Sequence, residues 1–150
     1  MMRHLTQTAA VALALSFMCT ALGCSRSASD PVPVVGRVFV DGKPATGATV
    51  VFHREGPPDN SAVKPIGKVD ANGEFHLTTK EANDGASPGE YRVTVTWYVS
   101  APIGKRSAEG DELPPRNLVP EKYTRYDATP LRATVSVEPT DPVTIEIKKK

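Results

Sequence analysis

The sequence predicts an all-β fold, a seven-stranded antiparallel β-sandwich, and three observations carry this prediction. Apolar and polar residues alternate in seven short segments, and a period of two is typical of strands with one buried face. The 150 residues include 14 Pro and 11 Gly, which favour turns over long helices. No segment has a convincing helical period. Strands with one apolar face each require a facing sheet, so two packed sheets are expected.

The expected strands are separated by turns of recognisable composition. Residues 41–44 and 70–73 are turn signals, because Gly adopts the positive φ that tight turns require. The second turn, with the strands on either side of it, predicts a hairpin. The strand at 91–99 carries the only Trp and is expected to be central. In order, the expected strands are 34–40, 49–54, 66–69, 74–79, 91–99, 131–137 and 143–147.

The alternation also predicts which side chains form the core. Phe52 and His53, for example, must point to opposite faces, with Phe52 inward. The expected inward residues from the second strand onward are Val50, Phe52, Phe75, Leu77, Tyr91, Val93, Val95, Trp97, Val99, Leu131, Ala133, Val135, Val137, Val143, Ile145 and Ile147.

The segment 100–129 has no clear period and is long for a loop inside a compact domain, which is typical of a functional or mobile segment. Exposed aromatic rings beside Arg can form a sugar- or peptide-binding patch. The alternative is that Tyr123 packs the loop onto the sandwich. The candidate binding residues flank or occupy the segment and are Tyr98, Arg116, Tyr123, Arg125 and Tyr126.

Residues 1–23 are interpreted as a secretory signal peptide. They contain Arg3 and no acid, and the apolar run at 9–18 is too short to cross a bilayer. The end of this segment resembles a bacterial lipobox, in which a small residue precedes a Cys that receives lipid. Lipid on Cys24 would anchor the protein to a membrane. The alternative is an ordinary secreted protein in which Cys24 is incidental.

The expected organisation follows from this interpretation. A flexible linker at 24–33 precedes one domain at 34–150, and the protein is a membrane-anchored lipoprotein of the cell envelope, facing the periplasm or the exterior. Both cysteines, Cys19 and Cys24, precede the domain, so the domain is expected to lack a disulfide. The net charge of +1 lacks the basic character of a nucleic-acid binder.

No catalytic or metal-binding pattern is evident. His53 and His76 fall on outward positions of expected strands, without the additional ligands that zinc requires. No phosphate-binding loop or nucleophile elbow occurs. We therefore expect neither a metal, a cofactor nor an enzymatic activity.

Four short motifs resemble carboxypeptidase regulatory-like domains, over nearly all of the expected domain. These are the opening at 36–52, a D-x-x-G-x-F hairpin at 70–75, a G-E-Y-x-V-x-V strand at 89–95, and a segment at 120–131 similar to small planctomycete lipoproteins. The resemblance implies a transthyretin-like (prealbumin-like) sandwich, a module that is an accessory without catalytic residues in metallocarboxypeptidases.

Three functions are carried forward from the sequence. The first is a non-catalytic, lipid-anchored envelope module with a structural or a ligand- or partner-binding role. The second is a carbohydrate-binding module of the envelope that uses the 100–129 loop. The third is a hydrolase with an unrecognised site.

Overall fold

The computed structural model describes residues 30–56, 63–100, 106–108, 110–111, 113–138 and 141–149. The segment interpreted as a signal peptide, Cys24 and most of the expected linker lie outside these ranges. The described chain is all-β, as expected, with one short 3₁₀ turn, η1 (Glu121–Tyr123), and no α-helix.

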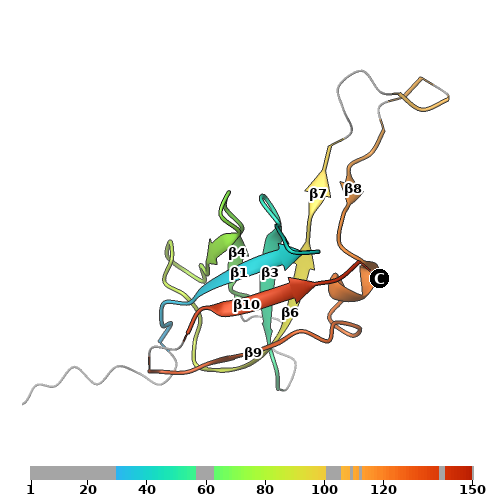
Figure 1. The fold of residues 1–150 in the computed structure, drawn as a ribbon. Helices are drawn as coiled ribbons and strands as arrows, with labels where there is room; N and C mark the ends of the chain where they lie inside the picture. The colour runs from blue at the N-terminus through green and yellow to red at the C-terminus, as the bar shows by residue number, and fades with distance from the viewer. Residues whose placement is uncertain are drawn as a thin grey trace, which may run out of the picture.

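Two four-stranded sheets form the body of the domain (Figure 1). The first sheet consists of β10 (Val143–Ile147), β1 (Val35–Val40), β2 (Lys43–Pro44) and β5 (Glu74–His76). The second sheet has the order β4 (Ile66–Lys68), β3 (Thr49–Arg54), β6 (Gly89–Thr96) and β9 (Arg132–Val135). A separate two-stranded ribbon pairs β7 (Tyr98–Val99) with β8 (Arg116–Asn117).

The core lies where the apolar faces of the two sheets meet, and the alternation predicted most of it. The largest fully buried side chains come from both sheets and are Phe52, Phe75, Leu77, Ile147, Val38, Val50, Val93 and Val95. Strand β6 is an inner strand of the second sheet, as expected for the segment that leads to Trp97. The prediction for Val137 was wrong: β9 ends at Val135, so the side chain of Val137 is 63% exposed.

One strand pair departs from the antiparallel prediction. β1 and β10 are paired in parallel, with Gly36 opposite Val143 and Val40 opposite Ile147. Consecutive strands joined by a tight turn must be antiparallel, but β1 and β10 are far apart in sequence, so no turn constrains their direction. The first sheet is therefore mixed.

The hairpin predicted around residues 70–73 is also divided between the two sheets. β4 pairs with β3, whereas β5 pairs with β1. The two segments are joined to each other by the bridge between Ile66 and Thr78 and by the hydrogen bond from the Asp70 N–H to the Glu74 carbonyl. The tight turn itself is present, with Gly73 at φ 85°. This turn therefore carries the chain from one sheet to the other.

The strand expected at 91–99 is interrupted at Trp97. The backbone N–H of Trp97 donates to Asn117 Oδ1 at 3.0 Å, and its indole Nε1 donates to the carbonyl of Thr46 at 2.9 Å. β6 therefore ends at Thr96, and the chain leaves the second sheet to form the β7–β8 ribbon. Figure 1 shows this ribbon projecting beyond the two sheets.

The N-terminal segment and the ribbon lie at opposite ends of the domain. Val32 pairs with Ala86, three residues before β6 begins, whereas the ribbon starts two residues after β6 ends. The eight residues of β6 span about 26 Å at about 3.3 Å per residue. Val32, where the chain enters the domain, and the β7–β8 ribbon are therefore separated by the length of β6, the longest strand.

Candidate functional site

The segment that follows the ribbon packs against the second sheet. Tyr123 is 8% exposed and Val119 is 5% exposed, and both belong to the core. The hydroxyl of Thr129 donates to the carbonyl of Val93 on β6 at 2.7 Å. Tyr123 is thus an anchor of this segment, and its ring is not available on the surface.

The structure separates the other candidate binding residues into two groups. Tyr98 is 63% exposed and lies on the ribbon, where the neighbouring pair is Val99 and Arg116. Arg125 and Tyr126 lie on the returning segment, after η1. The five residues that the sequence singled out therefore do not form one patch.

Arg125 is engaged by its own neighbours. Its guanidinium forms ion pairs with Asp127 at 2.7 Å and with Glu121 at 3.6 Å. The hydrogen bond from Arg125 lowers the pKa of the Asp127 carboxyl. Arg125 therefore closes the local turn, and its charge is already balanced.

Tyr126 lies over the outer face of the second sheet. Its ring centroid is 5.4 Å from that of His53, and the Arg92 guanidinium carbon is 5.2 Å from the Tyr126 centroid, within the range of a cation–π contact. Arg92 Nη1 also donates to the Tyr126 carbonyl at 3.4 Å. Two strands of the sheet thus position a ring that is still 45% exposed.

A row of three cationic or titratable side chains crosses this outer face. His53 on β3 is the register partner of Arg92 on β6, and Arg92 is the partner of Arg132 on β9. Residues directly opposite each other on adjacent strands point to the same face of a sheet. The three side chains are therefore neighbours, although 79 positions separate the first from the last.

Glu55 links the two arginines of this row. The Nε atoms of Arg92 and Arg132 each lie 3.0 Å from the same oxygen, Glu55 Oε1. Arg132 Nη1 additionally donates to the carbonyls of Thr129 and Leu131. One carboxylate therefore serves two guanidinium groups. We call His53, Glu55, Arg92, Tyr126 and Arg132 the outer-face cluster.

His53 is the half-buried member of the cluster. Its Nε2 lies 2.8 Å from Thr94 Oγ1, and Thr94 itself is only 6% exposed. Burial lowers the pKa of the His53 imidazole, and the positive charge of Lys64 lowers it further. The neutral form of His53 is favoured as a result.

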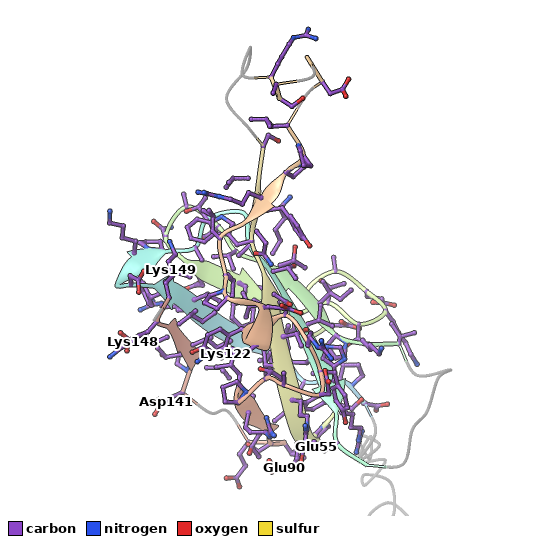
Figure 2. The ribbon with its side chains drawn as sticks, turned by 90° about the vertical axis from the view of Figure 1, so that its right-hand side faces the viewer. Glu55, Glu90, Lys122, Asp141, Lys148 and Lys149 are labelled. Atoms are coloured by element: carbon purple, nitrogen blue, oxygen red, sulfur yellow. The ribbon has the colours of Figure 1, made fainter. Side chains whose placement is uncertain are left out.

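Two acidic side chains lie side by side at this end of the second sheet. Figure 2 shows Glu55 and Glu90 adjacent to each other and away from Lys148 and Lys149, and the backbone N–H of Glu55 donates to the carbonyl of Glu90 at 2.8 Å. The Glu90 carboxylate accepts from Thr134 Oγ1 at 2.9 Å. Glu55 and Glu90 thus have different partners.

Sequence reasoning identified Tyr126 and the outward position of His53, but it missed Glu55, Arg92 and Arg132 as site residues. The signal that could have found Arg92 is the alternation, which places it outward on the same strand as Thr94. The register between β3, β6 and β9 was needed to bring the row together, and a single sequence does not contain that register.

His76, the second histidine, lies away from the outer-face cluster on β5. Its Nε2 is 3.5 Å from Glu74 Oε1, and Arg37 lies 3.3 Å from the other oxygen of the same carboxylate. Across the described ranges, no three His, Cys, Asp or Glu side chains are grouped closely enough to hold a metal ion. No helix in those ranges is long and apolar enough to span a bilayer.

Comparisons of the chain with protein-family models, with curated protein sequences and with solved structures find no match.

Proposed function

We propose that the protein is a non-catalytic, lipid-anchored module of the cell envelope that binds a ligand or a protein partner. A short apolar segment ending in Gly23-Cys24 supports the anchor. The core of the domain contains no cysteine, so the domain does not need a disulfide to fold in an oxidising compartment. This supports the proposed location in the cell envelope.

The observation that carries this proposal is the separation of the two ends of the domain. The linker from Cys24 enters beside Ala86, and the β7–β8 ribbon leaves beyond Thr96, at the far end of β6. A domain tethered at its point of entry would hold the ribbon away from the membrane. The ribbon is then the element best placed to meet a partner, because loops carried on a rigid scaffold are frequent binding elements.

We further propose that the two sheets form a sandwich of the transthyretin-like type. Strands near all seven expected positions, grouped around one core, support this assignment, and the short strand β2 brings the two sheets to eight strands. Of the alternatives, carbohydrate binding is favoured by the exposed ring of Tyr126 beside Arg92.

The contact that bears on a hydrolase is the 2.8 Å approach of His53 Nε2 to Thr94 Oγ1, but Thr94 is only 6% exposed, so its hydroxyl is not open to a substrate. The backbone N–H of Glu74 lowers the pKa of Asp70, and Arg125 lowers that of Asp127. A general acid requires a shift in the opposite direction.

The anchor is tested by fractionating cells that express the full-length protein. The wild type is expected in the membrane fraction and to carry a lipid mass on Cys24, because acyl chains supply the affinity for the bilayer at about 0.8 kcal/mol per buried CH₂. The Cys24→Ser variant should lose both, whereas Cys19→Ser should keep both. Export of an unmodified wild-type protein into the soluble fraction would overturn the proposal.

A further inference from the structure

We infer that the outer-face cluster is a binding site for a sugar unit that carries a carboxylate, such as a uronic acid. The inference deepens the binding role proposed above and names a ligand class for it. It places the ligand on the outer face of β3, β6 and β9, and it does not depend on the lipid anchor.

The first requirement of such a site is an exposed aromatic surface that is held in place. Tyr126 offers it, since 45% of the residue is exposed while Arg92 and His53 contact its ring. Tyr supplies a large contact area at low cost in conformational entropy, and its hydroxyl can bond to a polar ligand. The C–H face of a pyranose ring fits such a surface.

The second requirement is a cationic group that direct contacts with acids pair only in part. Arg92 and Arg132 share a single carboxylate oxygen of Glu55, so two positive charges meet one negative charge. The nearby carboxylate of Glu90 accepts from Thr134 and contacts neither guanidinium in the described ranges. Among the described residues, Glu55 is therefore the only acid in direct contact with either guanidinium, and each guanidinium can accept a further carboxylate.

The third requirement is a set of donors that no other described residue engages. Each guanidinium has five N–H groups. Arg92 uses Nε and Nη1, and so does Arg132. Among the described residues no hydrogen bond reaches either Nη2 atom. Two guanidinium groups with open donors suit a carboxylate, because charge-assisted hydrogen bonds are about twice as strong as neutral ones.

The remaining groups distinguish a sugar acid from a simple anion. Glu55 Oε2 and the second ring nitrogen of His53 can bond to hydroxyl groups of a ligand. An inorganic anion would gain nothing from the ring of Tyr126 or from these hydrogen-bonding groups. A sugar acid uses the ring, the arginines and the acceptor together.

The site is also fixed before a ligand arrives. Arg92 and Arg132 lie on adjacent strands, and Glu55 holds the Nε atom of each at 3.0 Å. Side chains that are already ordered lose little conformational entropy on binding, which increases the affinity obtained from few contacts.

The test is a titration of the purified full-length protein in detergent, followed by calorimetry. The probes are oligogalacturonate, a neutral oligosaccharide of equal length (cellohexaose) and acetate. We expect oligogalacturonate to bind at least about tenfold more tightly than either of the other two, since only this probe combines the ring with the charge.

Variants locate the site and control for folding. Tyr126→Ala and Arg92→Gln should each weaken oligogalacturonate binding by about tenfold or more, whereas Tyr126→Phe, which keeps the ring, should stay within about threefold of the wild type. Tyr98→Ala is the matched control, because Tyr98 is an exposed Tyr of the ribbon.

Three outcomes would overturn the inference: equal binding of the neutral oligosaccharide, loss of binding only in Tyr98→Ala, or no binding by a folded wild type. Because the Cys24→Ser variant should bind as the wild type does, a failed anchor and a failed ligand site give different results.

Discussion

At the scale of single residues, the pKa of His53 depends on the residues that surround its side chain. The alternation predicted an outward imidazole, and the structure places it on the outer face but half-buried between Thr94 and the ring of Tyr126. Burial there, together with the charge of Lys64, lowers the pKa of His53. The sequence could indicate the face but not the burial, because the covering residue, Tyr126, lies 73 positions further along the chain.

This pKa has a consequence for stability. A histidine whose pKa is lower in the folded state than in the unfolded state binds protons preferentially when unfolded. The contribution of neutral His53 to the free energy of unfolding is therefore fully present above about pH 6.5, the ordinary pKa of histidine. It decreases as the pH drops below that value towards the pKa of the folded state. Urea unfolding of the wild type should show a decrease in stability from pH 7 to pH 5.

The His53→Gln variant isolates the contribution of this group. Because Gln does not titrate, the variant should lose less stability than the wild type over the same pH range. Unfolding at pH 8 serves as the reference for any change unrelated to titration. The same pH dependence in both proteins would contradict the assignment to His53.

At the scale of the elements, Phe75 on β5 packs against strands of both sheets. Its ring occupies the space above two glycines, Gly36 on β1 and Gly67 on β4, which belong to different sheets. A Cβ atom on Gly36 would clash with Phe75 Cζ and would lie 2.7 Å from the carbonyl oxygen of Val143, and one on Gly67 would lie 2.8 Å from Phe75 Cδ2. Glycine is required at both positions because the aromatic ring takes the volume of a side chain.

Gly36→Ala should therefore destabilise the domain by about 1–3 kcal/mol through overpacking. In the double variant Gly36→Ala with Phe75→Leu, the smaller side chain removes the clash with the ring, whereas the close approach to the Val143 carbonyl remains. The combined loss should therefore be smaller than the sum of the two single losses, but not zero. Urea unfolding of the four proteins gives the coupling energy. Strictly additive losses would show that Phe75 and Gly36 do not compete for the same space.

The strands themselves were largely predictable, whereas their partners were not. Alternation around Val50, Phe52, Val93 and Val95 placed the strands and their inner faces correctly. It contains no information on which strand lies beside which, so the parallel pair of β1 and β10 and the transfer of β5 to the first sheet were missed.

The ribbon was missed for a related reason. β7 and β8 have only two residues each, which is too short for a period of two to be recognised. The candidate site depended on the same information, because the row from His53 to Arg132 exists only through the register of three strands.

At the scale of the whole molecule, the two ends of the domain carry different elements. The N-terminal linker enters at the end where β6 begins, and the ribbon leaves at the other end. The outer-face cluster lies nearer the entry end, since Glu55 follows β3 and its backbone bonds to Glu90. In the proposed arrangement, the ribbon is far from the membrane and the cluster is on the side of the domain.

The central claim is that Cys24 tethers a rigid domain that faces away from the membrane, and fluorescence quenching by lipid headgroups measures it most directly. The full-length protein, purified from the membrane fraction, is reconstituted in vesicles with one dye attached through either Val137→Cys or Tyr98→Cys. Both residues are 63% exposed in the wild type. Val137 lies just beyond β9, whose last residue, Val135, pairs with Gly89 at the start of β6, whereas Tyr98 lies beyond the end of β6.

The account predicts strong quenching at position 137 and weak quenching at position 98, because the two ends of β6 are about 26 Å apart. Equal quenching at both positions, stronger quenching at position 98, or failure of the protein to remain on the vesicles would contradict it.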